Sequence, residues 1–295
     1  TVGAEKAWAY AKKNNVCRMF IVNRMDAENA NYEKTIEQLR EKFGSSVVPL
    51  MLPIGEGAKF TGVVNVLENK AYSGKGKDLK EIPVPADMAP AIENALAEIT
   101  EAAAEAVDEL LAKYFEEGEL SHEEILQGFS AGMKSGSIVP AVPVSAVTGV
   151  GVAKLLDVMS AYLHSPEEAS FAGVNPKNDE EIIREGKTSE PFSAFVFKTI
   201  ADPFVGKLSM LRVCSGTLTS GTALYNSSCE KTEKAGGLFL LRGKNQLSVS
   251  QVSAGDIAAL SKLQFTNTGD TLCDAANPIR YEKISFPEPS VQKAV

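Results

Sequence analysis

The chain has 295 residues, of which 44% are apolar and 23% charged, and its net charge is −8. These values are typical of a soluble protein that can bury a core without disulfides, and the length predicts two or three domains. They exclude a protein whose whole surface clamps nucleic acid. The longest apolar runs are also far shorter than the roughly 20 residues that span a bilayer.

The first part of the chain alternates between helix and strand patterns. Residues 2–13 place apolar side chains on one helix face, and residues 17–22 form a short apolar run typical of a buried parallel strand. A second helix is expected over 31–43, ending at Gly44. This order of elements predicts an α/β sheet.

From Val47 the pattern changes to short strands separated by turn residues. Residues 87–117 then repeat apolar residues at steps of three and four, as one helix face does, and Ser121 and Glu124 have the spacing of a capping box. A buried strand over 138–144 and a helix over 151–163 follow. We therefore expect residues 47–134 to be an α+β subdomain inserted into an α/β domain formed by 1–46 and 135–166.

The last part of the chain has an all-β pattern. Residues 167–188 are polar and charged and are expected to form a linker. Residues 189–286 contain about seven short strands with turn residues between them, which predicts a small closed barrel. Residues 287–295, which contain two prolines, begin a further linker. The predicted fold class is thus multi-domain, α/β followed by all-β.

Charge is distributed unevenly. Residues 87–124 hold twelve acidic residues and one base, Lys113, whereas 189–286 have a net charge of +2. An acidic surface attracts a basic protein and repels phosphate, and the second region could tolerate a phosphate backbone. A solvated helix face would account equally well for the acidic run.

The first chemical signal is Asn23-x-x-Asp26 directly after the buried strand. A carboxylate can accept hydrogen bonds from the N1–H and N2–H of guanine, which adenine does not offer in that place, so such a site can discriminate strongly. The stem and flat guanidinium of Arg24 can lie across the base. Taken alone, the pattern is also that of a plain Asx turn at the end of a strand.

The second signal is Ser145-Ala146 after the strand at 138–144. A small residue there lets a backbone N–H approach the guanine O6. Ligands of α/β sheets bind at the carboxyl ends of the strands, where both motifs fall. Together the two motifs favour a guanine site over a turn.

The sequence gives no sign of a phosphate cradle. The motif G-x-x-x-x-G-K-S/T has only a partial match at Gly186-Lys187-Thr188, where Glu181 replaces the first glycine and no buried strand precedes it. No aspartate begins a D-x-x-G motif. We therefore expect no catalytic residue in this chain. We also expect no metal site, because Cys17, Cys214, Cys229 and Cys273 form no closely spaced pair and should be free thiols.

Several stretches resemble bacterial elongation factor G, a family of translational GTPases. They occur in the family's order: NRMD (23–26), FTGVVNVLENKAY (60–72), IPVPADM (82–88), VSA (144–146), the long stretch at 190–218, TGDTL (268–272) and FPEP (286–289). The resemblance covers essentially the whole chain. It implies the later part of a P-loop GTPase domain with its inserted subdomain, followed by the β-barrel of domain II.

The resemblance implies roles for the residues above. Asn23, Arg24 and Asp26 fall on one guanine-reading loop, and Ser145 and Ala146 on the other. GTP or GDP with Mg²⁺ would bind the full-length protein, whereas this piece, lacking the phosphate loop and both switch segments, would bind no nucleotide appreciably and hydrolyse none. Arg24 stands where the family usually has lysine, and the sequence of residues 236–246 departs from the one typical of elongation factors. Both features indicate a divergent paralogue.

The resemblance also implies partners and location. The family acts on the ribosome in the cytoplasm and moves tRNA and mRNA, coupled to GTP hydrolysis. The acidic helices at 87–124 would meet the ribosomal stalk protein, and the barrel at 189–286 would touch small-subunit ribosomal RNA; no membrane is expected as a partner. Two alternatives remain open: a ribosomal protection or release-factor type of translational GTPase, and a ribosome-binding module without enzymatic function.

Overall fold

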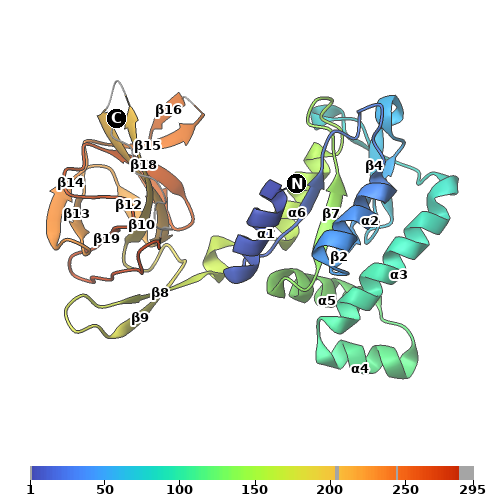
Figure 1. Cartoon of the computed structure of the whole chain (residues 1–295), viewed down its shortest axis with the longest axis horizontal. Coiled ribbons are helices and arrows are strands. Elements are labelled where there is room, and N and C mark those ends of the chain that lie inside the picture. The colour runs from blue at the N-terminus through green and yellow to red at the C-terminus, as the bar shows by residue number, and fades with distance from the viewer. Residues whose placement is uncertain (1, 203–205, 244, 286–295) are drawn as a thin grey trace. The chain divides into compact units, whose positions relative to one another are not determined.

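The computed structural model describes residues 2–202, 206–243 and 245–285. These residues divide into two compact units between His164 and Ser165. The first unit contains helices, a parallel sheet and an antiparallel sheet, and the second unit is built mainly from antiparallel strands (Figure 1). The linker predicted at 287–295 lies outside the described residues.

The first unit alternates helices and short strands. Its helices are α1 (Val2–Lys13), α2 (Tyr32–Phe43), α3 (Ala89–Glu105), α4 (Asp108–Glu117), α5 (His122–Ser135) and α6 (Val152–Tyr162). Its strands are β1 (Phe20–Val22), β2 (Val47–Pro49), β3 (Met51–Ile54), β4 (Gly62–Asn65), β5 (Lys70–Ser73), β6 (Lys80–Ile82) and β7 (Val139–Pro143).

A parallel sheet of order β1-β7-β2 lies at the centre of the first unit. Phe20 lies beside Ala141, and Val47 beside Val139. All five residues of β7 are buried, as expected for the middle strand of a sheet that is covered on both faces. Because the strands are parallel, the loops that follow β1 and β7 leave the sheet at the same edge.

A second sheet, antiparallel and of order β3-β4-β5-β6, lies between β2 and β7 in sequence, together with α3, α4 and α5. We call residues 51–135 the β3–α5 segment. Its buried side chains, such as Ile99 and Phe129, belong to the same hydrophobic cluster as Ile36 of α2 and Val142 of β7. The segment therefore shares one continuous core with the parallel sheet.

The helix ends follow the signals in the sequence. The side chain of Asn31 accepts a hydrogen bond from Lys34 N (2.8 Å) at the start of α2, and Gly44 ends that helix with φ at +97°. The predicted capping box is present at the start of α5: Ser121 N donates to Glu124 Oε2 (2.8 Å), and Glu124 N donates to Ser121 Oγ (3.4 Å).

Two expectations for the first unit are wrong. The inserted subdomain expected over 47–134 does not begin at Val47. Val47–Pro49 instead forms β2 of the parallel sheet, because its three buried residues pair with β7. The helix pattern at 87–117 is broken into α3 and α4, since Val107 is extended (φ −141°). Asp108 and Glu109 follow in the first turn of α4, where acidic side chains stabilise a new helix start.

The paired strands of the second unit are antiparallel in its described part. Its strands are β8 (Ser170–Val174), β9 (Glu181–Glu185), β10 (Ser193–Asp202), β11 (Gly206–Ser215), β12 (Thr217–Thr219), β13 (Ala223–Asn226), β14 (Lys231–Lys234), β15 (Gly237–Arg242), β16 (Asn245–Ser248), β17 (Gln251–Ser253), β18 (Ile257–Ser261) and β19 (Thr271–Cys273). Eight of them form one sheet of order β14-β13-β19-β10-β11-β18-β15-β16, and β12 pairs with β17. Closure into a barrel stays a prediction.

The linker expected at 167–188 is instead mostly a hairpin of β8 and β9. Burial alternates along β9 although the segment is polar: Ile182 and Arg184 are half-buried, and their neighbours are exposed. Two backbone hydrogen bonds between Val174 and Arg280 (2.9 and 2.8 Å) fix the hairpin to the segment after β19. The hairpin therefore belongs to the second unit.

In the described parts of the chain, no helix combines the length and the apolar composition that crossing a membrane requires.

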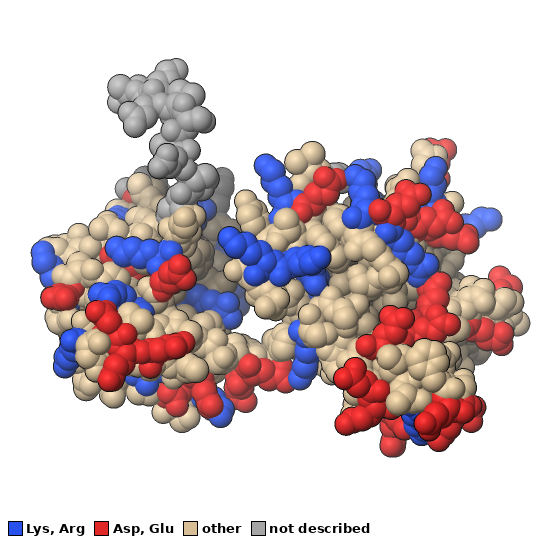
Figure 2. Space-filling model, turned by 60° about the horizontal axis from the view of Figure 1, so that its bottom comes forward, with Lys and Arg blue, Asp and Glu red and all other residues tan. Residues whose placement is uncertain are grey.

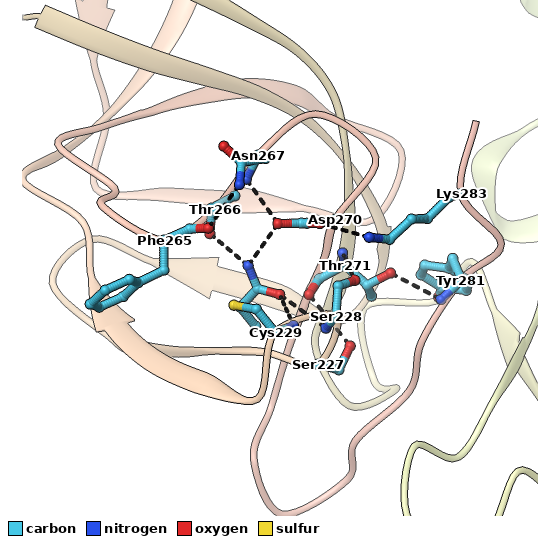
Figure 3. A network of polar contacts seen from close by, with 11 residues as sticks. Ser227, Ser228, Cys229, Phe265, Thr266, Asn267, Asp270, Thr271, Tyr281 and Lys283 are labelled. Atoms are coloured by element: carbon cyan, nitrogen blue, oxygen red, sulfur yellow. Dashed lines mark hydrogen bonds and ion pairs between the residues drawn. The ribbon is translucent and has the colours of Figure 1, made fainter. Parts of the chain in front are cut away.

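A buried carboxylate joins two loops of the second unit (Figure 3). Asp270 is 5% exposed, and its Oδ2 accepts hydrogen bonds from Asn226 Nδ2 (3.1 Å) and Asn267 N (2.8 Å). The next residue, Thr271, donates its N–H to Ser228 Oγ (3.1 Å) and accepts from Tyr281 N (2.9 Å). This network links the end of β13 to β19 and to the segment after it.

Asp270→Ala should destabilise the second unit by about 2–3 kcal/mol, because it leaves the N–H of Asn267 without its acceptor and removes a partner of Asn226. Urea unfolding followed by fluorescence would measure the loss. Asp274→Ala, at an exposed turn position, is the control and should cost less than about 1 kcal/mol. Equal losses for the two variants would contradict the role given to Asp270.

Glu124 should make the first unit sensitive to acid. The hydrogen bond from Lys113 Nζ (2.8 Å), aided by Ser121, lowers the pKa of Glu124 to about 2. Its stabilisation is therefore complete above the ordinary glutamate pKa of about 4.3 and is lost as the pH falls toward 2. Glu124→Gln should melt below the wild type at pH 7, and the difference should shrink with falling pH. Glu123→Gln, one residue away and exposed, is the control.

Candidate functional site

Two loops meet at the carboxyl edge of the parallel sheet. Residues 23–26 directly follow β1, and residues 145–150 follow β7, its neighbour in the sheet. Val144 N donates to Val22 O (2.9 Å) and Met25 N donates to Val144 O (3.2 Å), so the pairing continues past both strand ends. The structure therefore brings together all five residues that the sequence selected.

Asn23 ties the two loops together. Its Oδ1 accepts hydrogen bonds from Ala146 N (3.0 Å) and from Arg24 N (2.8 Å). The bond to Ala146 spans 123 residues of sequence. A plain Asx turn satisfies only its own backbone, so this contact across the two loops goes beyond the alternative interpretation of the motif.

Asp26 carries an unsatisfied acceptor. Its Oδ1 is buried and has no hydrogen-bond partner in the structure. The turn that presents it is tight, with Arg24 at φ +66° and Ala27 N donating to Arg24 O (2.9 Å). Buried polar atoms are almost always hydrogen-bonded, so an unpaired carboxylate oxygen at this edge indicates a place for donors from a ligand.

The second loop is held by its own backbone. Ser145 is buried, its N–H donates to Val150 O (3.0 Å), and its Oγ accepts from Thr148 N (3.1 Å). Ala146 is exposed, and its N–H is engaged by Asn23. A contact from this loop to the O6 of a guanine stays a prediction.

The sequence analysis missed Val147. This side chain is 84% exposed and lies next to Ala146. Arg24 is exposed on the neighbouring loop. An apolar surface and a guanidinium at one edge suit a flat aromatic ligand. The exposure of Val147 has no signal in the sequence, because it depends on the geometry of the loop.

α2 supports the site from beneath. Tyr32 is buried, and its hydroxyl donates to Ala141 O in β7 (3.2 Å). Burial raises the pKa of Tyr32 far above its usual range, so the hydroxyl stays protonated and keeps donating. The start of α2 is thereby fixed to the strand that carries the second loop.

The partial phosphate motif is not a phosphate site. Gly186-Lys187-Thr188 follows β9 of the hairpin, and the next regular element is strand β10 rather than a helix. Gly186 N donates to Ala169 O (2.8 Å), and Lys187 Nζ pairs with Glu185 (2.6 Å). Phosphate loops need free N–H groups at a helix start, and this segment provides none.

Residues suited to metal binding are not clustered in the described ranges: no three or more His, Cys, Asp or Glu side chains gather as a metal site would require. All four cysteines carry free thiols. Burial raises the pKa of Cys214 to about 11, so this thiol is protonated at neutral pH and has a packing role.

Two parts of the chain match families of known proteins. Residues 2–165 match the family model of the elongation factor Tu GTP binding domain. The chain belongs to this family. Residues 191–275 match elongation factor G domain 2, so this elongation-factor-type chain has a GTP-binding domain followed by a β-rich second domain.

A crystal structure of a protein from Thermus thermophilus is similar over 99% of the elongation-factor-type chain, with a TM-score of 0.79 and 27% sequence identity. The alignment covers 41% of that protein, so the chain spans less than half of its length.

Asn23→Ala should uncouple the two loops. Without Oδ1, the N–H of Ala146 loses its acceptor and should exchange with solvent about tenfold faster or more, as local opening becomes easier. Amide hydrogen exchange of peptides covering 144–150 would measure this. Asn29→Ala, at an exposed position on the first loop, is the control; equal protection in both variants would show that the tie has no effect.

Proposed function

We propose that this chain is the guanine-recognising part and the second domain of a translational GTPase of the elongation factor G type, which moves tRNA and mRNA on the ribosome. The order of the two family matches, 2–165 and then 191–275, supports this proposal. Such a role would place the protein in the cytoplasm. Arg24 and the segment at 236–246 support a divergent member.

The observation that carries the proposal is the paired loop geometry. Asn23 joins the loops, and the carboxylate of Asp26, whose Oδ1 has no hydrogen-bond partner, would accept from the N1–H and N2–H of a guanine. Arg24 and Val147, both exposed, would lie against the base. These residues bind and orient the base, and none of them performs chemistry on the phosphates.

GTP hydrolysis needs a phosphate cradle and Mg²⁺, and the chain contains neither a complete G-x-x-x-x-G-K-S/T motif nor a D-x-x-G motif. We therefore assign hydrolysis to a full-length protein in which this chain is joined to those motifs. In that protein, hydrolysis would transfer the γ-phosphoryl group of GTP to water, and the loss of this group would reset the switch segments. The chain alone is proposed to hydrolyse no GTP.

The acidic face of the first unit is the proposed contact for the ribosomal stalk protein. Figure 2 shows acidic side chains gathered over the end of the unit that carries α4. The exposed acids include Glu105, Asp108, Glu116 and Glu117, and Phe115 is 80% exposed among them. A carboxylate-rich face with one apolar side chain suits a basic segment with an apolar anchor.

The second unit is the proposed contact for small-subunit ribosomal RNA. Lys231 Nζ lies 4.1 Å from the centroid of the exposed Phe265 ring, and Lys234 and Lys262 line a pocket of about 250 Å³ beside it. Aromatic rings with neighbouring lysines are typical of surfaces on which bases stack and phosphates are neutralised.

Ribosome-stimulated GTP hydrolysis by the full-length protein tests the proposal. Stimulated hydrolysis with movement of mRNA would support it. Stimulated hydrolysis without movement, but with rescue or recycling of ribosomes, would favour a protection or release-factor type. Ribosome binding without hydrolysis would favour a non-enzymatic module.

Asp26→Asn should weaken GDP binding of the full-length protein on the order of 100-fold, because an amide cannot accept both N–H groups of guanine. Xanthosine diphosphate should bind the variant better than GDP, since its C2 carbonyl accepts from the new amide. Titration with fluorescent nucleotides would measure both affinities. Asp87→Asn, at an exposed position just before α3, is the control and should change neither; unchanged GDP affinity for Asp26→Asn would refute the role of this residue.

A further inference from the structure

Two turns of the β3–α5 segment reach the two loops of the site. The first is the turn between β3 and β4, which contains Glu56 and Gly57. Gly57 N donates to Met25 O (2.9 Å), and Glu56 Oε1 accepts from Tyr32 N (2.6 Å). This turn therefore supports the loop that carries Asp26 and the helix that follows it.

The contact at Gly57 leaves no room for a side chain. Gly57 has φ at +59°, and a Cβ added there would lie 3.3 Å from the carbonyl oxygen of Ala27. Such a distance is tighter than ordinary packing, so the loop would have to move by a few tenths of an ångström. Backbone therefore lies directly against backbone, one residue after Asp26.

The second turn lies between β5 and β6 and supports the other loop. Lys75 forms an antiparallel bridge with Val150, and a Cβ added at Gly149 would lie 3.4 Å from Lys75 Cβ. Close by, Lys154 Nζ lies 4.0 Å from the centroid of the Tyr72 ring of β5. The same antiparallel sheet thus contacts the loops after both β1 and β7.

We propose that these turns position the guanine-reading loops, with Gly57 as the positioning residue for Asp26. The inference rests on the proposed function and adds a second role to the β3–α5 segment: its small sheet sets the geometry of base recognition. Binding sites need their contacting groups held to within about 0.5 Å, and a shift of Ala27 would be passed directly to Asp26. Displacement of the sheet should therefore loosen the hold on the base.

Amide hydrogen exchange on this chain tests the positioning without nucleotide. Gly57→Ala should raise exchange of residues 25–27 about three- to tenfold, as local opening becomes easier. Gly118→Ala is a matched control: its φ is +79°, so the backbone strain is of the same kind, but an added Cβ would meet nothing within 4 Å, and Gly118 lies between α4 and α5, outside both turns. Equal exchange at 25–27 in the two variants would overturn the inference.

A second variant keeps the inference testable if Gly57→Ala folds poorly. Glu56→Gln keeps the shape of the turn and weakens the acceptor for Tyr32 N, so it should raise exchange over residues 24–32 by a smaller factor. If hydrogen exchange of the loop rose in neither Glu56→Gln nor Gly57→Ala, the turn would have no positioning effect.

Nucleotide discrimination in the full-length protein provides a readout that general destabilisation would not change. Inosine diphosphate lacks the 2-amino group that Asp26 is proposed to bind. Gly57→Ala should reduce the preference for GDP over inosine diphosphate about three- to tenfold, whereas Gly118→Ala should preserve it. An equal loss of affinity for both nucleotides would indicate general damage and contradict the inference.

The two proposals can fail separately. If exchange at 25–27 rises but the wild-type full-length protein does not prefer GDP, the proposed function fails while the contact at Gly57 stands. If the wild type prefers GDP and Gly57→Ala keeps that preference, the positioning role fails.

Discussion

The hydrogen bond from Ala146 N to Asn23 Oδ1 joins two loops that are distant in sequence and adjacent in space. It is possible because β1 and β7 are parallel neighbours, so both loops leave the sheet at one edge. The burial of β7 and the packing of α2 beneath it fix the position of that edge. The rest of the first unit can be understood as the support for this one contact.

The β3–α5 segment is part of that support. Its side chains pack in the same cluster as those of the parallel sheet, and β2, which leads into it, pairs with β7. A segment with its own core could move freely without affecting the sheet. One that shares a core transmits displacement, since packed interiors are dense and have few voids. Helices α3 and α5 therefore share a packed interior with the parallel sheet.

Much of the fold followed from local sequence signals. Asn31, Gly44 and the pair Ser121 and Glu124 marked helix ends correctly, because caps act within a few residues. A strand was expected from Val47, but it was assigned to the inserted subdomain, because three buried residues carry no period and their partner strand lies some ninety residues later. The hairpin of β8 and β9 was missed because its alternation is only between exposed and half-buried positions.

The site was predicted in part for a similar reason. Asn23 and Asp26 belong to a short motif after a strand, and the structure joins Asn23 to Ala146 of the second motif. Binding of a guanine by these residues stays a prediction. Val147 and Gly57 could not be found from the sequence. The exposure of Val147 and the close approach at Gly57 depend on contacts between segments, and single-chain patterns do not encode such contacts.

The two hydrogen bonds between Val174 and Arg280 join the beginning of the second unit to the end of its described part. Val174 is the last residue of β8, the first strand of the unit, and Arg280 follows β19, the last of its described strands. Tyr281, the next residue, is bonded to strands of the main sheet: its N–H donates to Thr271 Oγ1 in β19 (2.9 Å), and its hydroxyl forms a hydrogen bond with Ser193 Oγ in β10 (2.6 Å). A force that pulls the two ends of this unit apart would therefore act on the main sheet and on the pair of Val174 and Arg280 together. Tension on the unit would be shared among these contacts rather than carried by one of them.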